Sequence, residues 1–346
     1  MKLFNKIGGI HDHVENKFYT DKVISEIVTK KIKTLQSSSI KRGDNVILAH
    51  GNNHLFFCDL LALWSIGACV IPVDPGISKN ELQNLIKHSD SKMVIYRNVI
   101  SLKYSDGDKP ENLEILDTNN YQKNLKSSTN KVISINPLLD DHALMLYTSG
   151  STGEPKGVLH THRSFSNKMF SLKERLDLND FDVSLNLLPT HFGHGLICNC
   201  LFPFLHGKDL VILPSFSLDI LSKLGEIIDR YDVTFMSSVP TIWKIATIHS
   251  KRPTKTTLKR INCGSAPLGQ DLIKKITEWS GVDNIYNTYG ITETGSWIAG
   301  SKNNNSITED GYIGKPWGSE FLITNEDNIE IIKQGKIFSE CKENEL

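Results

Sequence analysis

The segment YTSGSTGEPKGV, from Tyr147 to Val158, combines hydroxyls, glycines and one lysine between two apolar runs. Glycine lets the backbone approach a ligand closely, and hydroxyls beside free backbone N–H groups suit phosphate oxygens. Lys156 adds a mobile cation, and Pro155 stiffens the chain just before it. The pattern predicts a phosphate-binding loop. Its predicted contacts are Thr148, Ser149, Gly150, Ser151, Thr152, Gly153 and Lys156.

Two other interpretations of this loop compete with the first. A flexible Ser/Gly linker has a similar composition, but a linker is not expected between two strand-like runs and does not explain the Pro-Lys-Gly ending. A P-loop requires G-x-x-x-x-G-K-[ST]. That spacing fails here, because Gly153 is followed by Glu-Pro and Lys156 is followed by glycine. The loop must therefore hold phosphate with a different geometry.

Small side chains follow a predicted strand at Gly264, Ser265, Ala266 and Pro267 and precede a predicted helix. Ligands bind at such carboxyl edges of a sheet, and small residues would let a flat group lie against the backbone. A tight turn without a ligand has the same pattern. The segment is therefore a candidate site only in company with other motifs.

The segment NTYGITE, from Asn287 to Glu293, offers an aromatic ring at Tyr289 and a carboxylate at Glu293. The ring could stack on a base, and the carboxylate is a hard oxygen ligand suited to Mg²⁺. A lone Thr-Glu pair is more often a solvated surface or a helix start, so this segment also needs support from its surroundings.

The segment LLPTHFGHGL contains His191 and His194 at the spacing H-x-x-H. This spacing could suggest a metal site, but no third ligand is near in the sequence and the surroundings are apolar, so the pattern argues against one.

Alternating strands and helices must position these segments. Apolar runs predict strands at 46–49, 68–73, 93–96, 183–188, 210–213, 233–237 and 260–263. Helical patterns fall at 53–66, 79–88, 218–231, 240–249 and 268–280. This alternation predicts an α/β fold of two packed αβ subdomains with largely parallel sheets. The predicted subdomains are 1–135 with a polar connecting segment, 136–300, and a β-rich start of a small barrel at 301–346.

Composition and charge exclude several function classes. The 346 residues carry 39 lysines and arginines against 39 aspartates and glutamates, so no net field recruits nucleic acid or an anionic membrane. The six cysteines show no CxxC pattern, which favours reduced thiols in the cytoplasm. No stretch reaches the roughly 20 apolar residues of a membrane span.

The loop and the other segments together resemble the adenylate-forming enzymes, the superfamily of acyl- and aryl-CoA synthetases, peptide-synthetase adenylation domains and firefly luciferase. The loop at 147–158 carries most of this resemblance. Four further segments follow in the order of the family. They are SVPTIWKI (238–245), INCGSAPLGQDLIKKI (261–276), IYNTYGITETG (285–295) and GYIGKPWGSE (311–320).

This resemblance implies ATP-dependent activation of a carboxylic acid as an acyl-adenylate, followed by transfer to coenzyme A. It implies catalytic roles for Lys156, Thr292 and Glu293, with Glu293 holding Mg²⁺ and Thr292 contacting the α-phosphate. Besides the loop, the ATP contacts that it implies are Gly264, Ser265, Ala266, Asn287, Thr288, Tyr289, Gly290 and Thr292.

The resemblance also implies that the segment LLPTHFGHGL borders the acid pocket. The pocket residues that it implies are His191, Phe192, His194, Ile242 and Gly264, with Trp243 and Trp297 as further apolar wall candidates.

The pocket segment departs from the family in two ways. The family usually places an aromatic residue before histidine, whereas this chain has His191 before Phe192, which leaves open which of the two faces the substrate. The amino-acid-activating branch places an aspartate here, and none occurs from 187 to 204. Because an unpaired buried ammonium is costly, we expect acids other than α-amino acids.

The chain ends at Leu346, where the family continues with a ribose-binding aspartate and a mobile C-terminal domain carrying a catalytic lysine. We therefore expect the chain to be the N-terminal body of the enzyme and deficient by itself. Two alternatives stay open: a ligase that loads the thiol of a carrier protein, and a non-catalytic module that binds nucleotide or acyl-adenylate.

Overall fold

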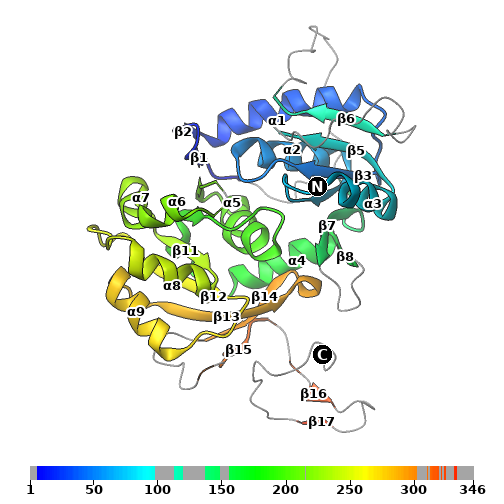
Figure 1. Ribbon diagram of the computed structural model, residues 1–346. Helices are drawn as coiled ribbons and strands as arrows, with labels where there is room; N and C mark the ends of the chain where they lie inside the picture. The colour runs from blue at the N-terminus through cyan, green and yellow to red at the C-terminus, as the bar shows by residue number, and fades with distance from the viewer. Residues whose placement is uncertain are drawn as a thin grey trace.

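Two large mixed sheets carry most strands of this chain (Figure 1). The computed structural model describes residues 6–97, 113–119, 137–148, 156–214, 216–301, 310, 312–318, 321, 323–324 and 331–332. In Figure 1 the six-stranded sheet lies in the upper part, and the nine-stranded sheet lies below it. The predicted α/β class with largely parallel sheets is confirmed.

The six-stranded sheet has the order β6-β5-β3-β4-β7-β8, and β8 alone runs antiparallel to its neighbour. Its strands are β3 (Asn45–Ala49), β4 (Cys69–Pro72), β5 (Ser91–Tyr96), β6 (Glu114–Asp117), β7 (His142–Thr148) and β8 (Lys156–Thr161). Side chains alternate between its faces. Val46 and Leu48 pack with helices α1 (Asp21–Gln36) and α2 (His54–Ile66), while Ile47 packs with α3 (Lys79–Ser89) on the opposite face.

The nine-stranded sheet has the order β15-β14-β13-β12-β11-β9-β10-β1-β2. Its six central strands are parallel, and antiparallel strands close both edges. The strands are β1 (Ile10–Asp12), β2 (Lys17–Tyr19), β9 (Val183–Asn186), β10 (Asp209–Ile212), β11 (Phe235–Ser238), β12 (Arg260–Gly264), β13 (Ile285–Ile291), β14 (Ser296–Gly300) and β15 (Lys315–Pro316).

The remaining helices connect these strands. They are α4 (His162–Lys173), η2 (Leu178–Phe181), η3 (His194–Leu201), α5 (Phe202–Leu205), α6 (Leu218–Ser222), α7 (Leu224–Tyr231), α8 (Pro240–His249), α9 (Gln270–Ser280) and η4 (Thr292–Thr294). Segment η3 is a π-helix, a form found often at functional sites. Within the described ranges, no helix is long and apolar enough to cross a bilayer.

Local caps explain where the predicted elements begin and end. Asn53 caps α2 by accepting a hydrogen bond from the backbone of Phe56, and Gly67 ends the helix at φ 79°. These bounds agree with the helix predicted at 53–66. The predicted helix 218–231 is wrong in one respect, because it breaks at Lys223 into α6 and α7. Gly225 at the start of α7 donates its N–H to Ser250 Oγ at 3.0 Å instead of continuing the first helix.

Other predictions differ from the structure at element boundaries. The helix predicted from residue 268 begins at Gln270, because Gly269 is extended and the Gln270 N–H donates to Asp310 Oδ1 at 3.0 Å. The sequence reasoning also missed α1, α4 and the β1–β2 pair.

The two sheets interleave along the chain. Strands β1 and β2 come first in the sequence but join the nine-stranded sheet, whereas β7 and β8 close the six-stranded sheet. The division at residue 136 therefore stays a prediction about folding units and does not describe which residues share a sheet.

The two sheets meet along a seam where the carboxyl ends of their parallel strands face each other. Asn52, after β3, donates to the carbonyl of Leu188, after β9, at 2.9 Å, and its Oδ1 accepts from the Thr190 N–H at 2.9 Å. Arg97, after β5, donates to Glu15, after β1, at 2.7 Å. Loops at the carboxyl ends of both sheets therefore lie together in this seam.

Most of the predicted β-rich segment at 301–346 lies outside the described residues. Strand β15 extends the nine-stranded sheet, and β16 (Ile323–Thr324) pairs with β17 (Ile331–Ile332) in an antiparallel two-stranded sheet. These strands agree with the predicted β character of the segment. The small barrel itself stays a prediction.

Candidate functional site

Four neighbouring parallel strands end at the seam and carry most of the predicted site residues. The order β13-β12-β11-β9 places their carboxyl ends side by side. Thr292 and Glu293 follow β13, Ser265 follows β12, and His191 and His194 follow β9. Residues separated by about a hundred positions in the sequence therefore share one sheet edge, the usual place for a ligand in α/β proteins.

The end of β12 is shaped by close contact with β13. Gly264 lies beside Thr288, and a Cβ at Gly264 would lie 2.6 Å from the Thr288 carbonyl oxygen. Ser265 adopts the left-handed region at φ 62°, which turns the chain away from the sheet. Ser265 and Ala266 are exposed. The segment thus presents small side chains at this sheet edge, and their contact with a base or acyl group stays a prediction.

Two of the predicted ATP contacts on β13 have structural bonds of their own. Asn287 is buried, and its side-chain amide donates to the Tyr312 carbonyl at 2.6 Å. The buried Thr288 hydroxyl donates to the Cys263 carbonyl at 3.3 Å. These side chains hold neighbouring segments together, and any ligand contact from them would compete with those bonds. Their role in ATP binding stays a prediction.

The end of β13 is more accessible. Tyr289, Gly290 and Thr292 are half-buried, and Glu293 is exposed on η4. Gly290 packs tightly against β14, since a Cβ there would lie 2.1 Å from the Ser296 carbonyl oxygen. The Thr294 hydroxyl donates to the carbonyls of Ile291 and Ser296 at 3.0 and 3.1 Å, which braces the turn that carries Glu293.

Strands β7 and β8 position the predicted phosphate loop. Thr148 ends β7, Lys156 begins β8, and the two residues pair across the hairpin. Lys156 is exposed. The five predicted contacts between them lie outside the described residues: Ser149, Gly150, Ser151, Thr152 and Gly153. Strand β8 contacts η4, so the two chain segments predicted to handle phosphate and Mg²⁺ are neighbours.

His194 lies in a buried network that the sequence reasoning did not find. Its Nδ1 bonds to Ser265 Oγ at 2.9 Å, and its Nε2 bonds to Ser237 Oγ at 2.6 Å. Asn199 donates to the Ser237 carbonyl at 2.7 Å and to Asn186 at 3.2 Å. Burial lowers the pKa of His194 to about 4, so the imidazole is neutral near pH 7. Every member of this network is uncharged.

His191 and Phe192 lie differently from each other. His191 is half-buried, with Nε2 3.9 Å from Asp74 Oδ2, and burial lowers its pKa while Asp74 opposes that shift. Phe192 is 37% exposed, and its ring centroid lies 6.0 Å from that of His194. The Phe192 ring therefore borders the His194 network, and which of the two residues faces the substrate stays open.

The predicted apolar walls separate into two groups. Trp297 is buried with its ring centroid 6.1 Å from His194, which places it beside the network. Ile242, near the start of α8, is 6% exposed. Trp243 is fully buried and packs against Trp279 in the core. Trp243 as a pocket wall is therefore wrong, because its ring faces the α8–α9 packing.

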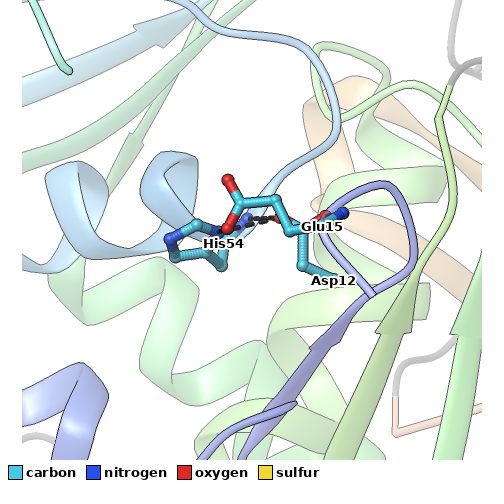
Figure 2. A group of neighbouring side chains, drawn as sticks. All are labelled: Asp12, Glu15 and His54. Atoms are coloured by element: carbon cyan, nitrogen blue, oxygen red, sulfur yellow. Dashed lines mark hydrogen bonds and ion pairs between the residues drawn. The ribbon is translucent and has the colours of Figure 1, made fainter. Parts of the chain in front are cut away.

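A separate group of possible metal ligands joins the sheets elsewhere in the seam. Among the described residues, Asp12, Glu15 and His54 form the one group of three whose ligand atoms lie within 4.8 Å of one another (Figure 2). Asp12 Oδ2 accepts from the ring and the backbone N–H of His54 at 2.8 and 3.2 Å. Glu15 accepts from Arg97 and from the Tyr19 hydroxyl. Because these atoms already have partners, the group is best explained as a hydrogen-bonded clasp between β1 and α2.

A groove of about 900 Å³ borders the start of the phosphate loop. Tyr147 of β7 forms one wall, and Leu85 and His88 of α3 form another. The Tyr147 hydroxyl and His88 Nδ1 lie 2.8 Å apart. A ligand could bind in this groove instead of at the ends of β9, β11, β12 and β13.

Comparison with known proteins decides the family. A family model described as AMP-binding enzyme matches residues 22–338. The chain belongs to the AMP-binding enzyme family. The predicted resemblance to adenylate-forming enzymes is confirmed.

Relatives of the chain include a CoA ligase and a peptide synthase. It is 27% identical over 305 residues to a 2-succinylbenzoate–CoA ligase of Geobacillus sp. (strain WCH70), covering 85% of this chain and 57% of the relative. It is 25% identical over 303 residues to a dimodular nonribosomal peptide synthase of Bacillus subtilis (strain 168), covering 87% of this chain and 12% of the relative. The chain thus spans less than two thirds of either relative.

Solved structures share the fold of this chain. The inhibitor-bound N-terminal domain of FACL13 from Mycobacterium tuberculosis matches with a TM-score of 0.83 and 21% identity, covering 95% of this chain and 83% of that one. O-succinylbenzoate coenzyme A synthetase (MenE) from Bacillus subtilis, in complex with ATP and magnesium ion, matches with a TM-score of 0.79 and 21% identity. That match covers 93% of this chain and 65% of the other.

Proposed function

We propose that this AMP-binding enzyme activates a carboxylic acid with Mg·ATP as an acyl-adenylate. One observation carries the proposal: the Glu293 turn lies against β8, the strand that leaves the predicted phosphate loop. The Gly264–Ala266 surface lies at the same sheet edge, one strand away. A phosphate-binding loop, a carboxylate and a flat surface at one edge suit the phosphates, metal and base of a nucleotide.

Each of these residues has a separate role in the proposed reaction. The carboxylate of the acid attacks the α-phosphorus of ATP, the acyl-adenylate bond forms, and the bond to pyrophosphate breaks. In this proposal Lys156 and the loop hydroxyls hold the departing phosphates, and Thr292 bonds the α-phosphate. Catalysis of this kind is mostly positioning and electrostatic stabilisation.

Glu293 fits the role of a Mg²⁺ ligand. Its carboxylate is exposed on η4, and no described residue forms an ion pair with it, so its oxygens are open to a cation. Carboxylate oxygens together with phosphate oxygens are the usual ligands of this ion. When bound, Mg²⁺ would neutralise part of the negative charge on the leaving pyrophosphate.

The neutral network around His194 favours an acid with an uncharged tail. His194, Ser237, Asn199 and Asn186 offer hydrogen bonds but no formal negative charge. An ammonium group buried beside them would have no carboxylate partner, which is costly. We therefore infer that α-amino acids are poor substrates.

We further propose coenzyme A as the acceptor of the acyl group, in line with the CoA-ligase relatives. The matches to peptide synthases favour a second candidate, the thiol of a carrier protein. The preferred acid distinguishes these two acceptors in part. The uncharged network around His194 argues against the amino acids that a peptide synthase commonly loads.

Stable acyl-adenylate analogues test this assignment directly on the 346-residue protein. Acyl-sulfamoyl adenosines that carry uncharged aliphatic or aromatic tails are expected to bind at least about tenfold more tightly than aminoacyl analogues of matched size, because of the unpaired ammonium. Calorimetric titration measures both sets, with AMP as the reference. Tighter binding of an aminoacyl analogue would contradict the acid assignment, and no binding of any analogue would contradict the proposed function.

A further inference from the structure

Lys168, on α4, packs directly beneath the turn that carries Glu293. Its Nζ donates to the carbonyl of Trp297 at 2.9 Å. A Cβ at Gly295, which ends η4, would lie 3.6 Å from Lys168 Cγ and 3.7 Å from Cε. The same position is 3.9 Å from Cε1 of His160 on β8. Lys168 and His160 therefore both pack against the end of η4.

The surroundings of Lys168 are unusual for a lysine. The residue is half-buried, and no carboxylate of the described residues forms an ion pair with it. Burial lowers the pKa of its ammonium. Holding a partly buried ammonium without a carboxylate costs free energy, and methionine would fill the same space without that cost. The retained charge and hydrogen bond call for an explanation beyond packing.

His160 lies beside it, where burial lowers its pKa while a hydrogen bond to the Thr292 backbone and the charge of Glu293 oppose that shift. It is 5% exposed, and its Nε2 has no hydrogen-bond partner among the described residues. It lies four positions after Lys156 on β8. One of the two residues that pack against the Glu293 turn thus belongs to β8, the strand that leaves the predicted phosphate loop.

This arrangement connects three parts of the site through one side chain. Helix α4 follows β8 directly, so Lys168 is anchored on the phosphate-loop side of the seam. Its bond to Trp297 holds the first residues of β14, which follow the Glu293 turn. Trp297 in turn packs against His194 of the proposed acid pocket.

We propose that Lys168 is a positioning residue for the proposed Mg·ATP site. By bonding the Trp297 carbonyl and supporting Gly295, it sets the distance between the Glu293 turn and the strand that leaves the phosphate loop. This inference rests on the proposed function. It assigns no contact between Lys168 and the nucleotide, and it concerns the metal-binding side of the site more than the base.

Substitution of Lys168 separates this role from simple packing. Lys168→Met keeps the length of the side chain and removes its donor, whereas Lys168→Arg keeps a charged donor. The matched control is Lys173→Met, which removes an exposed lysine from the same helix. Calorimetry measures binding of Mg·ATP and of metal-free AMP to the 346-residue protein, and thermal melting monitors folding.

Residues that orient metal ligands typically change metal-dependent function about 10- to 100-fold when removed. We therefore expect Lys168→Met to weaken Mg·ATP binding about tenfold or more and AMP binding less than about threefold. Lys168→Arg should recover most of the loss, and Lys173→Met should bind as the unaltered protein does. Should Lys168→Met fail to fold, Lys168→Gln takes its place with the same expectation.

Equal weakening of Mg·ATP and AMP, or no weakening of either, would overturn the positioning role while leaving the proposed function intact. Failure of arginine to recover binding in a folded variant would also overturn it. If the unaltered protein binds AMP and acyl-adenylate analogues but gains nothing from Mg²⁺, the assignment of Glu293 fails, and this inference fails with it.

Discussion

Gly264→Ala is expected to abolish most nucleotide binding, although it adds only one methyl group. The new Cβ would lie 2.6 Å from the Thr288 carbonyl oxygen and 2.7 Å from its hydroxyl, so β12 and β13 must move apart. Overpacking of this kind typically costs about 1–3 kcal/mol. The strands that would separate carry Ser265 on one side and the Thr292–Glu293 turn on the other. The proposed base and metal contacts would therefore lose their spacing.

Gly269→Ala is the matched control, because it adds the same methyl group at the next glycine along the chain. There the backbone is extended, and the nearest side-chain atom would be 3.6 Å away. We expect ATP affinity to fall about 10-fold to 100-fold for Gly264→Ala, since each 1.4 kcal/mol is tenfold, and to stay within about twofold for Gly269→Ala. Calorimetric titration with Mg·ATP measures both. Unchanged affinity in Gly264→Ala would show that this edge does not hold the nucleotide.

Lys156→Ala should weaken ATP binding far more than AMP binding. Lys156 begins β8 at the mouth of the hairpin, and its exposed ammonium is available to phosphates that AMP does not have. A hydrogen bond to a charged group contributes about 1.5–3 kcal/mol, which is roughly a 10-fold to 100-fold change in affinity. The expected change for AMP is less than about threefold.

Lys275→Ala serves as the control for Lys156→Ala, because Lys275 is an exposed lysine on α9, away from the seam. Titrations with ATP, ADP and AMP should show the effect growing with the number of phosphates. Equal losses for all three nucleotides would place Lys156 near the base or ribose and not at the β- and γ-phosphates.

The position of a motif in the fold could be predicted where the motif lies next to a recognisable strand end. Gly264 ends β12, which was predicted from its apolar residues at 260–263, and parallel strands bring their carboxyl ends together. Strand β13, which precedes Glu293, was not predicted from the sequence. The caps of α2 at Asn53 and Gly67 were also predictable, because the capping residues adjoin the helix in the sequence. Local patterns of this kind do not depend on distant contacts.

Residues that act through distant contacts were not predictable in the same way. Ser237 becomes a partner of His194 only because β11 and η3 meet in the fold. In the sequence Lys168 is an ordinary polar residue of a helix, and its bond to the Trp297 carbonyl on β14 is known only from the fold. Strands β1 and β2 are only three residues long, which gives too few positions for an alternation to be recognised.

The seam between the sheets explains why these distant contacts matter. Its links come from both sheets: Asn52 with Leu188, Arg97 with Glu15, and the clasp of Asp12 with His54. The predicted phosphate hairpin belongs to one sheet, and the predicted base and metal contacts belong to the other. The spacing across the seam therefore sets the geometry of the proposed site.

Hydrogen–deuterium exchange of the 346-residue protein with and without Mg·ATP tests the central claim most directly. The claim is that one nucleotide is held by the hairpin around 148–156, the end of β12 at 264–267 and the turn at 289–295. We predict that Mg·ATP slows exchange in peptides from all three segments together, with little change in α3. Protection confined to the groove between α3 and Tyr147, with none at 264–267 or 289–295, would contradict it.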